Sequence, residues 1–189
     1  MNAVCERKVL DVELVKADPL DTIAGVFDSI DFDYFRANCN RWFHAVIINQ
    51  SHVYDEEDRR TGLQTLFVDL ELLLEAIYVI HINASGANVT RRPVKYDKVY
   101  LLTHEQADNP NDVLCSFFKK FSMPYIRQEL KDWLQAGIDI DASDPVQLKA
   151  IKVLLTFNDL ECLLEAAYQY CKYGISGIGK RAKNSLAML

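Results

Sequence analysis

The chain contains one twelve-residue stretch twice. The copies are FVDLELLLEAIY at residues 67–78 and FNDLECLLEAAY at residues 157–168, and they share nine of their twelve residues. A match of this density indicates an internal duplication, which constrains the fold more strongly than any short motif. In both copies the leucines recur at the three- and four-residue spacing of an amphipathic helix. The chain is therefore predicted to contain the same helical unit twice.

The duplication extends towards the N-terminus when single-residue shifts are allowed in the turns. Arg36 then aligns with Arg127 and Trp42 with Trp133, so residue types unrelated to the leucine pattern recur in the same order. The predicted segments are repeat one at residues 8–82, a linker at 83–97, repeat two at 98–172 and a basic C-terminal tail at 173–189. A chain of 189 residues is long enough to bury both repeats in one core, so we expect a single domain.

Three helices are predicted in each repeat. In repeat one, Asp18 and Pro19 provide an N-cap followed by a proline at the first helical position. Apolar residues at helical spacing then indicate a second helix at residues 31–49 and a third at residues 55–82.

Similar signals recur in repeat two. Ser122 is a predicted N-cap of its second helix, Gly137 is a predicted αL terminator of that helix, and the third helix is expected at residues 145–172. Residues 1–16 and 83–108 give no decisive pattern, so their conformation stays open. The predicted fold class is all-α: a tandem duplication of a three-helix unit packed as a pseudo-twofold helical bundle.

The third helices differ between the repeats on the face opposite the shared core stripe. In repeat one this face carries Val68, Leu72 and Val79. The corresponding residues of repeat two are Asn158, Cys162 and Gln169. The third helix of repeat one is therefore predicted to lie at the centre of the bundle or in a subunit interface. The matching face of repeat two is expected to be hydrated.

The composition disfavours several classes of protein. A net charge of −6 disfavours a general role on nucleic acid or on an anionic membrane. No apolar run approaches the roughly 20 residues of a membrane span, and the first residues lack the apolar core of a signal peptide. We therefore expect a cytoplasmic protein without a membrane partner. The five cysteines are odd in number and never spaced as Cys-x-x-Cys, which predicts reduced thiols.

Opposite charges recur with the duplication. If the second and third helices of each repeat form an antiparallel hairpin, an arginine on one lies level with carboxylates on the other. The expected partners are Arg36 with Asp69 and Glu71, and Arg127 with Asp159 and Glu161. We predict ion pairs that fix how the helices dock, because a guanidinium holds a carboxylate with two parallel hydrogen bonds. The alternative is a ligand site formed by the same pairs.

A second interpretation gathers four glutamates around the pseudo-twofold axis, as in di-metal helical bundles. These residues are Glu71, Glu75, Glu161 and Glu165. Bundles of that type also use Glu-x-x-His triplets, and the sequence contains none. No histidine occupies the same position in both repeats. We therefore predict neither a metal nor a cofactor.

Three aromatic positions recur in the duplication. They pair Tyr34 with Tyr125, Trp42 with Trp133, and Tyr78 with Tyr168. Such residues could line a ligand pocket between helices, but aromatic side chains at helical spacing favour the core. We predict that all of them are core residues.

The tail contains the sequence GISGIGKR, which approaches the phosphate-binding pattern G-x-x-x-x-G-K-[ST]. Arg181 replaces the final Ser or Thr, and a helix precedes the segment where that pattern requires a strand. Residues 175–186 also resemble the helix-hairpin-helix element of non-specific DNA-binding proteins, through Gly177-Ile178-Gly179. The resemblance implies nucleic-acid contacts by Lys180, Arg181 and Lys183. We prefer the simpler prediction, a glycine-terminated helix followed by a short cationic helix.

Common catalytic motifs are absent from the sequence, including G-x-S-x-G, H-E-x-x-H and G-x-G-x-x-G. The predicted function is that of a non-catalytic helical interaction or regulatory protein, which forms a homo-oligomer or binds another protein. The first alternative is a nucleic-acid-associated factor that uses the basic tail. The second is a small-ligand or metal-dependent enzyme built on the repeated arginine and carboxylate pairs.

Overall fold

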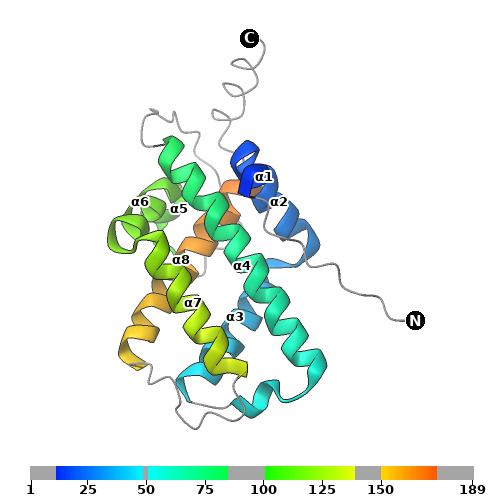
Figure 1. Cartoon of the computed structure of the whole chain (residues 1–189). Helices are drawn as coiled ribbons and strands as arrows, with labels where there is room; N and C mark the ends of the chain where they lie inside the picture. Colours follow the sequence, from blue (N-terminus) through cyan, green and yellow to red (C-terminus); the bar gives the residue numbers. More distant parts are fainter. Residues whose placement is uncertain (1–11, 49–50, 85–100, 139–149, 174–189) are drawn as a thin grey trace, which may run out of the picture.

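Helices make up the fold in the part of the chain that the computed structural model describes, which is residues 12–48, 51–84, 101–138 and 150–173 (Figure 1). These residues form no β-strand, so the predicted all-α class is confirmed. The α-helices are α1 (Val12–Ala17), α2 (Pro19–Ser29), α3 (Phe32–Ile47), α4 (Glu57–Ala84), α5 (His104–Asp108), α6 (Pro110–Lys120), α7 (Met123–Ile138) and α8 (Ala150–Tyr173). A short 3-10 helix, η1 (Ser51–Tyr54), precedes α4.

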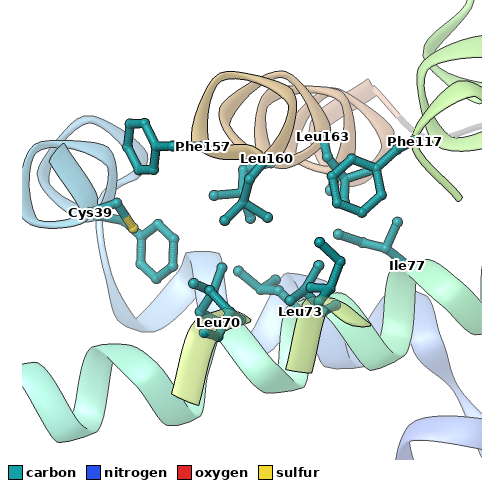
Figure 2. Close-up of a cluster of buried hydrophobic side chains, with 14 of the residues drawn as sticks. Cys39, Leu70, Leu73, Ile77, Phe117, Phe157, Leu160 and Leu163 are labelled. Carbon is teal, nitrogen blue, oxygen red and sulfur yellow. The ribbon is translucent and has the colours of Figure 1, made fainter. Parts of the chain in front are cut away.

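The two longest helices, α4 and α8, enclose the centre of the core between them. Leu70, Leu73 and Ile77 project from α4 towards Leu160 and Leu163 of α8 (Figure 2). None of these five residues is more than 2% exposed. Because full burial of a Leu or Ile side chain contributes about 1.5–3 kcal/mol, this layer is a main source of stability.

The shorter helices connect the two halves of the chain. α2 packs on α4 and α6 packs on α8, and each also contacts the long helix of the other half. Phe27 of α2 lies against Tyr168 of α8, with ring centroids 5.3 Å apart. Phe118 of α6 lies against Tyr78 of α4 at 5.1 Å. α3 and α7 contact each other, α3 also contacts α8, and α7 packs on α4. The halves are therefore interlocked.

Two helices of the first half begin at aspartate N-caps, and the cap of α2 is the one that the sequence predicts. Asp18 caps α2 by accepting a hydrogen bond from the Asp21 N–H at 3.1 Å, and Pro19 is the first residue of the helix. Asp31 caps α3 by accepting from the Tyr34 N–H at 3.1 Å. Both caps satisfy backbone donors that have no partner inside the helix, which is why these residues define its start.

Gly137 lies inside α7, next to its last residue, so the predicted αL terminator is wrong. The helix begins as predicted, directly after Ser122. A Cβ atom at Gly137 would lie 3.2 Å from Leu63 Cδ2 and 3.3 Å from Trp42 Nε1. The glycine therefore lets α7 approach α3 and α4 closely, and its role is packing rather than helix termination.

Among the described residues, each half contains one short α-helix more than the predicted three. α1 precedes α2, and α5 precedes α6. α5 starts with a capping box, in which Thr103 Oγ1 accepts from the Gln106 N–H and Gln106 Oε1 accepts from the Thr103 N–H. Both helices lie in segments whose conformation the sequence left open.

The outer faces of α4 and α8 differ from the prediction. Val68 and Leu72 on α4 are only half-buried and pack at the edge of the core. Gln169 on α8, expected to be hydrated, is 4% exposed. It extends a buried polar row that includes Glu161 and Glu165 at four-residue spacing. The row is enclosed because α3 and the segment before α5 lie over the two glutamates.

Some predictions concern residues outside the described part of the chain. α4 continues to Ala84, two residues past the expected end of repeat one, and residues 85–97 of the predicted linker are not among those described. Residues 174–189 of the tail, with the candidate nucleic-acid contacts Lys180, Arg181 and Lys183, also lie outside it. No helix among the described residues is both long and apolar enough to cross a membrane.

Candidate functional site

Arg127 of α7 binds a carboxylate of the other half of the chain. Its Nε donates to Glu75 Oε1 of α4 at 2.7 Å, and its Nη2 also contacts that oxygen. The sequence had placed Arg127 near Asp159 and Glu161 of its own repeat, and this pairing is wrong. α7 packs on α4, and Asp159 forms an ion pair with Lys120 of α6 instead.

Glu71 lies one turn before Glu75 and faces the same helix, α7. Burial raises the pKa of Glu71, while the charges of Lys131 and Arg127 on α7 act in the opposite direction. The nearby Glu75 carboxylate adds a smaller upward effect on this pKa. Two carboxylates of α4 are thus placed against two cations of α7, four residues apart on each helix.

A corresponding arrangement joins α3 to α8. Asn40 Nδ2 donates to Glu161 Oε1 at 2.7 Å. Burial raises the pKa of Glu161, and the Asn40 hydrogen bond and the Arg36 charge both oppose that shift. Arg36 and Asn40 are four residues apart on α3, as Arg127 and Lys131 are on α7. Both arrangements therefore join helices from different halves of the chain.

Glu165 is the most deeply buried of the candidate carboxylates, with 1% exposure. Its Oε2 accepts hydrogen bonds from the backbone N–H groups of Leu101 at 2.7 Å and Leu102 at 3.3 Å. Hydrogen bonds to a charged acceptor stabilise more than neutral ones. Glu165 thus holds the segment before α5 against α8.

The glutamates do not form the proposed four-carboxylate centre. Glu75 and Glu161 are bound by side chains of the opposite half, and Glu165 is bound by backbone N–H groups. In the described ranges no three His, Cys, Asp or Glu side chains are arranged to hold a metal ion. The chemistry of these contacts is that of helix docking, in which a buried charge is satisfied by a partner from another helix.

Two surface grooves lie at aligned positions of the two predicted repeats, where the sequence favoured core residues. The polar groove lies between α3, η1 and α4 and has a volume of about 730 Å³. The apolar groove lies between the end of α6, the start of α7 and the start of α8, with a volume of about 670 Å³. Tyr34 lines the first and its aligned counterpart Tyr125 lines the second.

Large side chains and two lysines form the apolar groove. Its lining residues are Lys120, Phe121, Tyr125, Ile151, Lys152, Leu155 and Thr156. The rings of Phe121 and Tyr125 stack with centroids 5.7 Å apart, and Lys152 Nζ lies 4.9 Å from the Tyr125 centroid. Lys152 forms an ion pair with Glu129, and this hydrogen bond raises the pKa of Lys152.

Polar side chains from two helices form the walls of the polar groove. They include Tyr34, Asn38 and Arg41 of α3 and Asp58, Thr65 and Asp69 of α4, and Gly62 of α4 also lines the groove. The predicted core residue Tyr34 is 63% exposed, so that prediction is wrong: its ring lies at the groove. Tyr54 of η1 also lines the groove and is largely buried. Burial raises the pKa of Tyr54 to about 12, with the charge of Arg41 acting in the opposite direction.

A signal for the apolar groove is present in the aligned repeats. Ile151, Leu154 and Leu155 occupy positions that hold Thr61, Gln64 and Thr65 in repeat one. Exposed apolar residues at positions where the aligned helix is polar are the pattern that could have indicated this surface.

The geometry is the source of any functional assignment for this protein. No protein family model, curated protein or solved structure matches the chain.

Proposed function

We propose that the chain is a tandem duplication whose product is a non-catalytic interaction protein, and that it self-associates through the first turns of α8. The duplication is supported by helices of equal length in the same order: α2 and α6 have 11 residues each, and α3 and α7 have 16 each. A pseudo-twofold relation is supported by the exchanged contacts. Phe27 with Tyr168 corresponds to Phe118 with Tyr78.

The observation that carries self-association is the exposed apolar stripe on α8. Ile151 is 75% exposed, Leu155 55% and Leu154 43%, and they follow the i, i+3, i+4 spacing of one helix face. The aligned positions of α4 are polar and exposed, so the fold does not require apolar residues there. Spacing of this kind matches the contact surface of a second helix.

The occupant that fits this surface best is a second copy of the chain. Lys152 and Lys120, the two cations at the apolar groove, are neutralised by Glu129 and Asp159 of the same chain. The patch is therefore close to electrically neutral, and two copies can meet across a twofold axis without strong repulsion. The Ile151 and Leu155 side chains of each copy would then enter the apolar groove of the other.

Sedimentation equilibrium across a wide dilution range tests this proposal. Wild-type protein should approach twice the 21.6 kDa monomer mass as concentration rises. The double variant Ile151→Thr/Leu155→Thr, which installs the residues of repeat one, should stay monomeric. Ile82→Thr is the matched control, because Ile82 is 54% exposed on α4 and should leave association unchanged. Wild-type protein that stays monomeric, or a double variant that still associates, would refute self-association through α8.

A further inference from the structure

The polar groove carries charged side chains of both signs, from α3 and from α4, and one of its two aspartates, Asp69, already has an interaction partner. Arg41 of α3 and Asp58 of α4 both line it, and both are exposed. Within the described residues neither takes part in an ion pair: the guanidinium of Arg41 donates only to Asn38 Oδ1, at 3.4 Å. Arg59, the other cation of the lining, is already paired with Glu56 at 3.2 Å. Arg41 and Asp58 are therefore available to a bound molecule.

Gly62 leaves open space in the lining of the same groove. It lies inside α4, and no atom comes within 4 Å of a Cβ built at this position. Glycine is unfavourable in a helix interior because its backbone loses more conformational freedom on folding than that of any other residue. Its counterpart in repeat two is Lys152, so the duplicated helix does not need a small residue there. The absence of a side chain leaves space above the helix.

The groove also has the size and the aromatic surface of a small-molecule site. Its volume of about 730 Å³ falls within the range of known ligand pockets. Tyr54 and Tyr34 both line the groove, and the Tyr34 side chain is exposed. Asn38 orients the guanidinium of Arg41 by accepting its hydrogen bond.

We propose that this groove binds a small zwitterion with a carboxylate and an ammonium group, such as a free amino acid. The carboxylate binds Arg41, the ammonium group binds Asp58, and the body of the molecule occupies the space above Gly62. This site is independent of the apolar groove and of self-association, since it lies in the other repeat.

Titration of ¹⁵N-labelled full-length protein with each of the twenty free L-amino acids tests the site by NMR. At least one should shift the Gly62 amide signal saturably while the signal of Gly25 stays unchanged. Gly62→Phe should abolish binding by filling the groove. Gly25→Phe is the matched control, because Gly25 is also a helical glycine with open space around it but lies on α2, outside the groove.

Charge variants test the assignment of the two ends. Arg41→Gln and Asp58→Asn should each lower the affinity for the tightest-binding amino acid by about tenfold or more. This is the usual effect of losing a hydrogen bond to a charged group. An analogue of that amino acid without its ammonium group should lose the interaction with Asp58 and keep the interaction with Arg41. If no amino acid shifts Gly62, or if Gly62→Phe binds like the wild type, the zwitterion site is refuted. The double variant on α8 should bind normally, which separates this result from the test of self-association.

Discussion

The ion pair between Glu75 and Arg127 is asymmetric in burial. The Glu75 side chain is 10% exposed, whereas that of Arg127 is 44% exposed. Removing one partner strands the other, and the cost depends on how far the stranded charge is from water. A buried carboxylate without its cation is an uncompensated charge that water cannot reach, which destabilises the fold. A half-exposed guanidinium without its carboxylate can be hydrated.

We predict that Arg127→Met destabilises the fold by about 3 kcal/mol, while Glu75→Met costs about 1 kcal/mol. Urea unfolding of both variants measures the difference. The double variant should cost less than the sum of the two, since it leaves no buried charge. Arg59→Met is the control: the pair with Glu56 is exposed on both sides, so its loss should have almost no effect. Equal costs for both single variants would show that burial does not control this pair.

Helical glycines act differently in different elements. Gly25 in α2 has open space where a Cβ atom would be, whereas a Cβ atom at Gly137 in α7 would meet Trp42 and Leu63. Trp42 cannot move easily, because its Nε1 donates to the carbonyl of Trp133 at 3.2 Å and its ring packs against that of Phe67. The close approach of α7 to α3 and α4 therefore depends on the missing side chain.

Gly25→Ala and Gly137→Ala should change stability in opposite directions. Alanine at position 25 should stabilise by up to about 1 kcal/mol through helix propensity. At position 137 the cost of overpacking exceeds the same gain in helix propensity, and we expect a net loss of stability of about 1 kcal/mol. Thermal unfolding of the two variants measures both effects. A stabilised Gly137→Ala variant would mean that the α7 contact can relax, contrary to the packing role of this glycine.

At the scale of the whole molecule, the two halves complete each other. The core layer lies between α4 of the first half and α8 of the second (Figure 2). The contacts of Arg127 with Glu75 and of Asn40 with Glu161 also join the two halves. A half on its own would expose the apolar face of its long helix to water. Because burial of that face is the main favourable term, an isolated half has little to stabilise it.

Separate production of residues 1–84 and 98–189 should therefore yield fragments without cooperative thermal unfolding. Mixing them should restore the near-ultraviolet circular dichroism of the full chain, since the buried Trp42 and Trp133 rings meet across the two halves at 6.3 Å. A fragment that unfolds cooperatively by itself would show that the repeats are independent domains.

The sequence by itself determined where the longer helices lie, because their signals act over a few neighbouring residues. Asp18 and Asp31 cap the helices that follow them, and the leucine spacing of the repeated stretch marks the buried face of α4 and α8. Tertiary structure alone decided the partner of Arg127, the burial of Gln169 and the grooves beside Tyr34 and Tyr125. Each depends on which helices lie side by side. The packing of the whole core decides this, because it brings α7 into contact with α4 and α3 into contact with α8.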